Sequence, residues 1–376
     1  MSDPSSRSWA EIDLDAIRSN ARLCRSLSGG RRIMAVVKAN AYGHGLAPVV
    51  HALEPEVDML GVAGLHEALE VRAAGVSKPI FLLGASLGGE IPGIVAAEGL
   101  VGSLSSLAEA RVFSAEAIRQ EREVAVHAVV DTGMGRIGFL PENWTAEVAE
   151  ELANLPGLKL CGVASHLPSA DEDKAFTRAQ ISKFREVTAT VRDLEMHIAN
   201  SAGVIGFSSL EIGDVVRPGL MLYGISPLPE TVEGLRPAMV LKSRITLVRD
   251  LPAGSTISYG GTYQCSKATR VATVAIGYGD GYPRNLSGMG AEVEIVGRRC
   301  PVLGRVTMDQ IMVDVSGLAT GPEPGTEAIL FGGGVTGIGV EELAGLSGTI
   351  PWEIFTGITP RVRRVYVGDE TPTETS

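Results

Sequence analysis

Between Ile33 and about Gly219 the sequence contains eight short apolar runs rich in β-branched residues, and longer segments of helical period lie between most of them. Segments such as LHEALEVRAAG and DKAFTRAQISKFREVTATVRDL carry the helical pattern. Such alternation is typical of parallel strands joined by helices, and eight repeats predict an α/β fold with a (β/α)8 TIM barrel. The eighth run is the least regular because it contains Pro218, which cannot donate a ladder hydrogen bond. The runs are 33–38, 59–64, 79–85, 100–105, 123–130, 158–166, 196–201 and 212–219.

After Pro227 the pattern changes. The segments VLKSRITLVRDL, TRVATVAIGYG, AEVEIVGRRCPVLG and QIMVDVSGL are rich in β-formers, and turn residues separate them. The sequence therefore predicts a barrel over residues 1–234 and a C-terminal, mostly β domain with an exposed tail over residues 235–376. A first strand around residues 8–13 can join the β domain.

The charge and cysteine content exclude several classes of partner. With 33 basic and 44 acidic residues, the net charge of −11 gives no basic field for nucleic acid or an anionic membrane surface. The N-terminal residues lack a secretory pattern, and no apolar run is long enough to span a bilayer, so a cytoplasmic location is expected. Four separated cysteines and no H-x-x-x-H pair predict neither a disulfide framework nor a metal site.

Unusual polar residues fall where the predicted strands end. In a TIM barrel the active site lies at the carboxyl ends of the strands, and phosphate commonly binds after strands seven and eight. These polar positions are therefore candidates for an active site. They are Lys38 after the first run, Asp131 and Arg136 after the fifth, His166 at the sixth, Asn200 and Ser201 at the seventh, and Arg217 and Gly219 at the eighth.

Lys38 is the most informative of them, because it stands directly behind the apolar residues of AVVKANAYGHG. A partly desolvated lysine at a strand end has a lowered pKa and can form a Schiff base. The alternative is a structural lysine that extends its ammonium group to solvent. Position alone leaves both interpretations open.

Seven motifs, in order across both predicted domains, resemble those of alanine racemase, the barrel-type enzyme that depends on pyridoxal 5′-phosphate. The resemblance covers the chain from about Trp9 to Tyr366. The motifs are AVVKANAYGHG, DTGMGRIGF, HIANSAG, VVRPGLMLYGI, ISYGGTY, AIGYGDGYPR and GRVTMDQIMVD.

The resemblance implies two catalytic bases, as a racemase needs one on each face of the reacting carbon. Lys38 matches the residue that holds the cofactor and handles the proton on the D-side. Tyr259 matches the base that handles the L-side proton and reaches the site from the other subunit of a homodimer with shared active sites. From the residues alone, Tyr259 would instead be a core or hairpin tyrosine beside two glycines.

The remaining matches bind cofactor and substrate. Arg217 matches the residue that faces the pyridine nitrogen, where an arginine donates a hydrogen bond without fully protonating the ring, and His166 matches the residue that orients it. Arg136 matches the contact to the cofactor phenolate and the substrate carboxylate. The expected phosphate contacts are Tyr42, Ser201 and the amides around Gly219 and Leu220, and the expected substrate contacts are Arg136, Met308, Asp309 and Tyr278.

Two positions depart from the family pattern. At one, Trp352 of IPWEIF stands where the family usually has a tyrosine near the phosphate and the substrate entrance, which removes one hydroxyl contact and reshapes the entrance. The other is Val129. Many members carry a carbamylated lysine two residues before the aspartate of DTGMGR, and this chain has Val129 there. That carbamate cannot form, so Arg136 must be oriented by another group.

Three other interpretations fit parts of the sequence. The segment GGGVTG, residues 332–337, satisfies G-x-G-x-x-G but lacks the surrounding βαβ unit of a dinucleotide site. A non-catalytic pyridoxal-phosphate carrier would resemble the barrel alone. A decarboxylase of basic amino acids would carry a catalytic cysteine motif that this sequence lacks. The prediction is therefore racemisation of alanine, feeding D-alanine to cell-wall synthesis. The alternatives are a broader serine and alanine racemase, or a non-catalytic pyridoxal-phosphate carrier or regulatory protein.

Overall fold

The computed structural model describes residues 6–189, 191, 193–210, 212–230 and 232–368, and the described residues form two compact units. The barrel unit comprises Ala16–Ala41 and Leu46–Arg236. The β unit comprises the described parts of Met1–Asp15, Tyr42–Gly45 and Pro237–Ser376.

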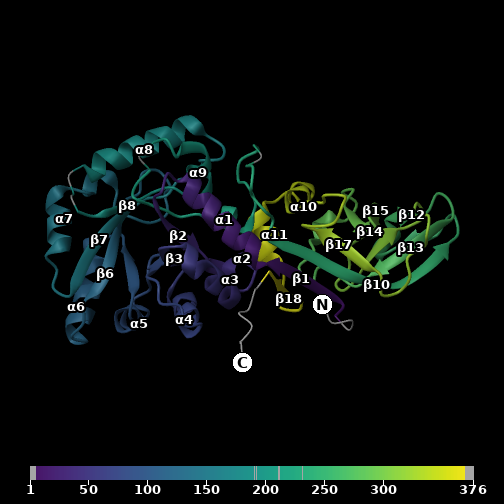
Figure 1. Ribbon diagram of the computed structural model, residues 1–376, viewed down its shortest axis with the longest axis horizontal. Helices are drawn as coiled ribbons and strands as arrows, with labels where there is room; N and C mark the ends of the chain where they lie inside the picture. Colours follow the sequence, from purple (N-terminus) through teal and green to yellow (C-terminus); the bar gives the residue numbers. More distant parts are fainter. Residues whose placement is uncertain (1–5, 190, 192, 211, 231, 369–376) are drawn as a thin grey trace, which may run out of the picture. The chain divides into compact units, whose positions relative to one another are not determined.

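The barrel unit is built on eight parallel strands in the order β8-β7-β6-β5-β4-β3-β2-β9 (Figure 1). The two end strands approach each other, since the backbone N–H of Asp214 donates to the carbonyl oxygen of Met196 at 2.7 Å. The sheet is therefore a nearly closed barrel. Its strands are β2 (Arg32–Val36), β3 (Met59–Val62), β4 (Ile80–Leu82), β5 (Leu100–Leu104), β6 (Val124–Val129), β7 (Leu158–Ala164), β8 (Glu195–His197) and β9 (Val215–Val216).

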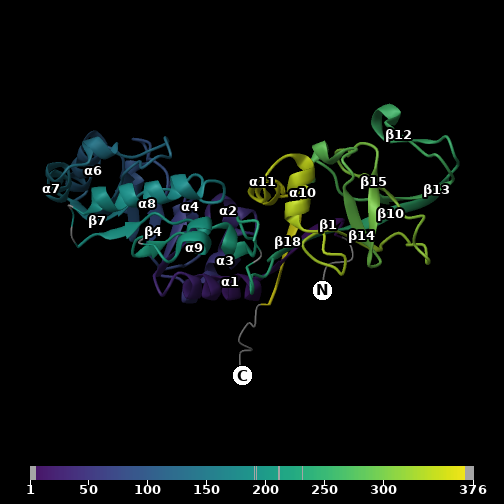
Figure 2. The same cartoon turned by 90° about the horizontal axis from the view of Figure 1, so that it is seen from above.

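Helices follow these strands and lie around the outside of the barrel (Figures 1 and 2). Side-chain caps fix where several begin: Asp173 accepts hydrogen bonds from two backbone N–H groups of α8, and Ser106 accepts one from α6. The helical segments are α1 (Leu14–Leu27), α2 (Lys38–Tyr42), α3 (Leu46–Leu53), α4 (Leu65–Ala73), α5 (Ile91–Ala96), α6 (Leu107–Arg119), α7 (Ala146–Ala153), α8 (Lys174–Thr188) and α9 (Ser201–Phe207), with the short 3-10 turns η1 (Glu54–Glu56), η2 (Pro141–Asn143) and η3 (Leu220–Tyr223).

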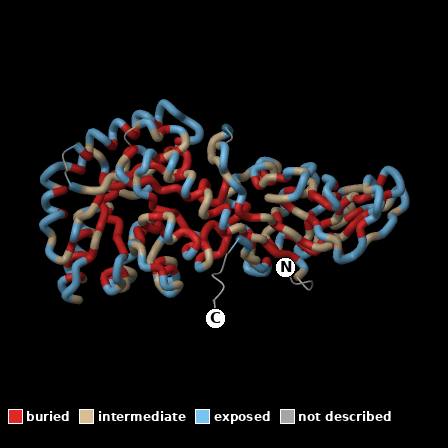
Figure 3. The backbone as a smooth tube through the Cα atoms, in the orientation of Figure 1, coloured by how far each residue is buried: buried red, intermediate tan, exposed pale blue. Residues whose placement is uncertain are grey.

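Most residues of the barrel strands are buried (Figure 3), as expected for a parallel sheet covered on its outer face, although β7 and β8 also carry half-buried residues. One interior layer takes a side chain from each of five strands. Met34, Met59, Phe81, Val101 and Val215 form this cluster, and each is at most 6% exposed. At this level the barrel interior is thus a packed apolar core.

The β unit has a mostly antiparallel sheet in the order β13-β16-β15-β14-β17-β10-β1-β18, in which β13 also pairs with β10. The N-terminal strand β1 pairs with β10 antiparallel and with β18 parallel. The helices α10 and α11 contact each other (Figure 2). The elements are β1 (Ser8–Asp13), β10 (Met239–Leu251), β11 (Thr256–Ile257), β12 (Tyr263–Gln264), β13 (Thr269–Val274), β14 (Glu292–Ile295), β15 (Arg298–Leu303), β16 (Ile311–Asp314), β17 (Glu327–Phe331), β18 (Arg363–Val367), α10 (Val340–Ser347), α11 (Pro351–Gly357), η4 (Tyr259–Gly261) and η5 (Arg284–Leu286).

The predicted fold class is confirmed, because each of the eight predicted apolar runs contains or overlaps one barrel strand. The eighth strand is only two residues long and ends before Pro218, which cannot extend the ladder. The helix predicted over residues 173–194 ends earlier, at Thr188, and residues 190 and 192 lie outside the described residues.

Candidate active site

Lys38 begins α2, which is a left-handed turn at the end of strand β2. Backbone φ at residues 39–42 lies between +52° and +55°. For residues other than glycine this conformation costs about 1 to 2 kcal/mol each, so other contacts must hold the turn. The backbone N–H of the first of these residues donates to Glu67 at 2.7 Å, and Asn40 Oδ1 accepts from the N–H of Leu46 at 2.7 Å. These bonds fix the backbone from which the lysine projects.

The Lys38 amine is half-buried, and its pKa lies below the ordinary value. Burial is the main cause and the nearby Arg136 cation the second, while Glu67 acts in the opposite direction. Both main causes disfavour the charged ammonium form. Lys38 therefore has the electrostatic character of a nucleophilic amine.

Arg217 follows β9 and is only 5% exposed. Its Nη1 donates to Nδ1 of His197 at 2.6 Å and to the carbonyl oxygen of the same residue at 2.8 Å. Its Nη2 donates to the carbonyl oxygens of Ser165 at 2.5 Å and Ile198 at 3.3 Å, and to Nδ1 of His166 at 3.3 Å. Within the described part of the chain no group accepts from Nε, so this donor is available to a ligand.

Burial, and secondarily Arg136, lowers the pKa of Arg217 to about 10, which leaves the guanidinium charged at neutral pH. The pKa of His166 falls to about 3, because of burial first and then the cations Arg217, Arg136 and Lys38. His166 is therefore neutral near pH 7 and can accept a hydrogen bond from the guanidinium.

The sequence predicts only His166 beside Arg217, and it misses two further histidines. His197 is the closer histidine, and behind it His127 Nδ1 lies 2.8 Å from His197 Nε2. Both residues interrupt apolar runs, in EVAVHAVV and MHIANS. A histidine within a buried strand is the signal that could have found them.

Ser201, Gly219 and the adjoining 3-10 turn form a small cradle of polar groups. Ser201 begins α9 behind Asn200, whose side chain caps that helix by accepting from the N–H of Gly203 at 3.0 Å. Ser201 Oγ accepts from the backbone N–H groups of Gly219 at 2.9 Å and Met221 at 3.3 Å. Because these two N–H groups donate to Ser201, the donors left for a ligand are the Ser201 hydroxyl hydrogen and the N–H of neighbouring Leu220, which suit an anionic group such as phosphate.

Tyr42, the last residue of the left-handed turn, is counted with the β unit and is only 7% exposed. Burial raises the pKa of its hydroxyl to about 12. The segment after it packs against α11 and β18: the Gly43 carbonyl oxygen accepts from Nε of Arg364 at 3.0 Å, and the rings of His44 and Phe355 meet edge to face.

Arg136 lies in an exposed turn after β6. The Asp131 carboxylate holds the backbone of this turn by accepting from the N–H groups of residues 133–136 at 2.7 to 3.2 Å. Val129 is 8% exposed and offers no polar group. Within the described residues, no carboxylate pairs with the guanidinium of Arg136, so backbone placement by Asp131 is the positioning that the structure shows.

The predicted residues of the β unit lie in two turns. Tyr259 stands at the tip of the β11–β12 hairpin with its side chain 70% exposed, so it is not a core residue. Tyr278 and Met308 are adjacent, because the N–H of Gly279 donates to the Met308 carbonyl oxygen at 2.8 Å. Asp309 is exposed and accepts a hydrogen bond from Arg361 at 2.7 Å.

The backbone of the glycine-rich segment 332–337 is hydrogen-bonded to a carboxylate of the same chain. Glu294, which is 5% exposed, accepts from the backbone N–H groups of Val335 at 3.2 Å and Thr336 at 2.8 Å, and from the Thr336 hydroxyl at 2.6 Å. An anionic side chain of the protein already satisfies these donors, and no βαβ unit surrounds them. The segment is a structural loop.

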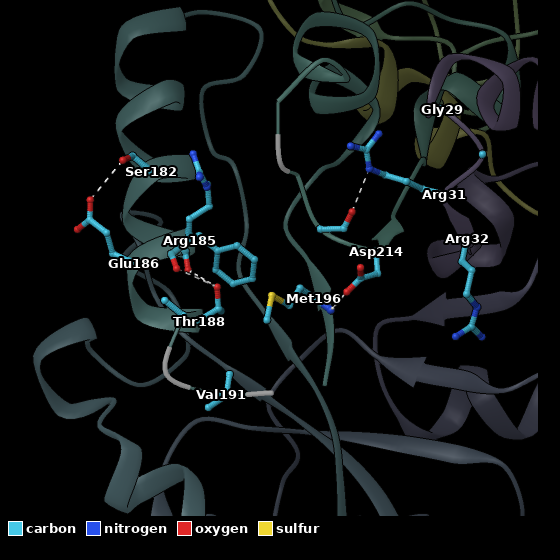
Figure 4. A pocket seen from close by; sticks show the side chains of 14 residues that line it. Gly29, Arg31, Arg32, Ser182, Arg185, Glu186, Thr188, Val191, Met196 and Asp214 are labelled. Carbon is cyan, nitrogen blue, oxygen red and sulfur yellow. Dashed lines mark hydrogen bonds between the residues drawn. The ribbon is translucent and has the colours of Figure 1, made fainter. Parts of the chain in front are cut away.

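A large cavity of about 1240 Å³ lies at the amino-terminal ends of the barrel strands, opposite to Lys38 (Figure 4). Its polar groups are used structurally. Arg31 donates to four backbone carbonyl oxygens, Arg32 pairs with Glu195, and Asp214 accepts from the N–H of Met196 at 2.9 Å. In a TIM barrel this end serves stability rather than catalysis.

Neither a membrane-spanning helix nor a cluster of three potential metal ligands is found among the residues that the structure describes. The four cysteines are free thiols, three of them buried.

Comparison with known proteins gives one consistent result. Residues 12–227 match the model of the alanine racemase N-terminal domain, and residues 238–366 that of the C-terminal domain. An alanine racemase of Methylacidiphilum infernorum is 41% identical over 364 residues, covering 96% of this chain and 92% of the relative. The alanine racemase of Streptomyces lavendulae, a D-cycloserine producer, has a TM-score of 0.91 at 36% identity over 97% of this chain and 98% of that one. That of Bartonella henselae, solved with covalently bound pyridoxal phosphate, has a TM-score of 0.88 at 27% identity over 96% and 100%. The chain therefore belongs to the alanine racemase family.

Proposed function

We propose that this chain interconverts L-alanine and D-alanine with pyridoxal 5′-phosphate as its cofactor, as its family does. The observation that carries the proposal is Lys38: a half-buried amine of lowered pKa, on the barrel rim that also carries Arg217 and Ser201.

The residues of the barrel rim fit this cofactor. Ser201 and the amides near Gly219 and Leu220 would hold its phosphate, with Tyr42 as a further contact. The free Nε of Arg217 would donate to the ring nitrogen. When bound, the cofactor withdraws electrons from the α-carbon of the amino acid and stabilises negative charge there.

Lys38 would hold the cofactor covalently through Nζ and, once the substrate takes that place, move the proton on the D-side of the α-carbon. Arg136 would fix the substrate carboxylate with its planar fork of donors. Arg217 remains charged and donates a hydrogen bond without giving up its proton, so the ring stays a moderate electron sink. A moderate electron sink favours return of a proton to the α-carbon over side reactions.

Tyr259 would move the L-side proton, in the site of a second copy of the chain. Its side chain is 70% exposed at a hairpin tip, which suits a residue that another subunit covers. Tyr278, Met308 and Asp309 would reach the same shared site and line its substrate end. The working unit is then a homodimer, in which the barrel and the β domain of one chain contribute to different sites.

The product would be D-alanine for cell-wall synthesis in the cytoplasm. Serine is the closest competitor, since one hydroxyl in a pocket changes discrimination by only about 1 to 3 kcal/mol.

The test combines two inactive variants. Purified wild-type protein should erase the circular dichroism of L-alanine, while Lys38→Ala and Tyr259→Phe should each be inactive. Mixing the two variants should restore about a quarter of wild-type activity, because half of the random dimers then carry one intact site. A mixture that stays inactive after verified subunit exchange contradicts the shared site, and wild-type protein that leaves alanine unchanged contradicts the function.

A further inference from the structure

Two buried histidines inside the barrel have no part in the proton transfers described above. His127 is 1% exposed on β6, and His197 is fully buried on β8. The strand between them, β7, has Gly162 opposite His127, and a Cβ there would lie 2.9 Å from two atoms of the His127 ring. The rings meet over this glycine, and Phe81 packs on both, with ring centroids 5.1 and 5.2 Å away.

The hydrogen bonds between these rings can run in only one direction. A guanidinium has no acceptor, so Nδ1 of His197 must accept from Arg217 over the 2.6 Å contact. The proton of neutral His197 is then on Nε2, which donates to Nδ1 of His127 at 2.8 Å. Nδ1 of His127 is therefore an acceptor as well, and both histidines are Nε2–H tautomers.

The electrostatic setting agrees with two neutral rings. Burial, followed by the Arg217 cation, lowers the pKa of His127 to about 4 and that of His197 well below its ordinary value. A proton added to His127 Nδ1 would face the Nε2–H of His197, and one added to His197 Nδ1 would face the guanidinium. Neither contact is favourable in a buried site.

We propose that His127 is a positioning residue for the reaction: its Nδ1 accepts the Nε2–H that the Arg217 contact imposes on His197, which holds the His197 ring in place, and His197 in turn holds Arg217 in the one orientation that leaves Nε free for the ring nitrogen of the cofactor. The inference rests on the proposed function, but the tautomers belong to the protein alone. His127 itself touches neither substrate nor cofactor. Its effect reaches the site through the hydrogen bonds of His197.

Two substitutions separate positioning from packing. His127→Phe keeps the ring volume but removes the acceptor, which leaves the Nε2–H of His197 unpaired. His127→Asn places an amide oxygen near the position of Nδ1 and keeps an acceptor, although it loses volume. If packing alone matters, the phenylalanine variant should be the better of the two.

The first measurement is the ¹⁵N NMR spectrum of the full-length protein labelled at histidine, with the cofactor removed. We expect Nε2–H tautomers for His127 and His197 in wild-type protein, the same tautomer for His197 in His127→Asn, and an altered His197 signal in His127→Phe. The second measurement is turnover with the cofactor loaded. His127→Phe should lower kcat about 10- to 100-fold with little change in KM for alanine, and His127→Asn should keep most of it.

A His197 proton on Nδ1 in wild-type protein would overturn the proposal. So would a fully active His127→Phe, or a His127→Asn as slow as His127→Phe. If wild-type protein shows the expected tautomers but racemises no alanine, the proposed function fails while the hydrogen-bond order stands, so the two failures are distinguishable.

Discussion

The substitution Gly43→Ala tests how tightly the segment after the left-handed turn is held. Gly43 has φ of +79°, and an added Cβ would lie 2.3 Å from the carbonyl oxygen of Phe355. Because that oxygen belongs to the backbone of α11, it cannot rotate away as a side chain could. The Gly43 carbonyl is also the acceptor for Arg364, so any displacement weakens a second contact.

The matched control is Gly290→Ala. Gly290 lies in the same unit with φ of +78° and nothing within 4 Å of the added Cβ. The left-handed strain of about 1 to 2 kcal/mol, partly offset by restriction of the unfolded chain, is common to both variants. Overlap adds about 1 to 3 kcal/mol at Gly43 alone. We therefore expect Gly43→Ala to lower the free energy of unfolding by about 2 kcal/mol more than the control does.

The assay is urea unfolding followed by tryptophan fluorescence in a Trp144→Phe background, so that the signal comes from Trp9 and Trp352 of the β unit. Gly43→Ala should also weaken cofactor binding, because Tyr42 is its neighbour. A displacement that costs one hydrogen bond raises Kd about tenfold. Equal unfolding free energies for the two variants would show that the loop yields freely and would refute the reasoning.

Three further outcomes follow from single contacts. Asp131→Ala should lower kcat/KM at least about tenfold with little loss of stability, because the exposed turn that carries Arg136 loses its acceptor; steady-state kinetics with Asp131→Asn as the control check this. Ser201→Ala should lower the unfolding free energy of the cofactor-free protein by about 1 to 3 kcal/mol, since two buried N–H groups lose their acceptor; Ser201→Thr, which keeps a hydroxyl, should lose less in thermal melts. Between about pH 6.5 and 4, His127 is protonated in the unfolded chain but stays neutral in the folded protein. The free energy of unfolding should therefore fall by up to about 1.4 kcal/mol for each unit that the pH falls in this range. His127→Asn should reduce that slope, and identical pH profiles for the two proteins would contradict it.

The sequence predicts the barrel well because its signal is local. Each apolar run is bounded by turn residues, and eight alternations leave few topologies other than a closed parallel sheet. The same reasoning brings the residues at strand ends to one rim, since the carboxyl ends of parallel strands share an edge. Lys38, Ser201 and Arg217 required no knowledge of side-chain contacts to be chosen.

Other features depend on contacts that no short segment contains. Residues 39–42 form a left-handed turn although two of them are alanine, which disfavours that conformation, and a hydrogen bond to the distant Glu67 helps to hold it. The pairing of His127 with His197 requires the order β6-β7-β8 and a glycine on the strand between them. The short helix α10 contains Gly345, which weakens a helical pattern in the sequence. The helix α11 has only seven residues, with Pro351 at its start, and so presents too short a pattern to be recognised.

The charges of the barrel rim form one arrangement rather than separate features. Arg136 lowers the pKa of Lys38 and of Arg217, and all three cations lower that of His166. Every hydrogen-bond acceptor around Arg217 is a neutral carbonyl or imidazole, so the buried cation has no carboxylate partner among the described residues. Cations that repel one another before a ligand binds are stabilised by a ligand rich in negative charge, and the proposed cofactor and substrate supply a phosphate, a phenolate and a carboxylate. Binding of the cofactor and substrate then stabilises the folded barrel by mass action. With Val129 in place of the carbamylated lysine, the protein offers Arg136 no carbamate anion. Its negative partners must then be the bound cofactor and substrate, so we expect substrate affinity to be the property most affected by Val129.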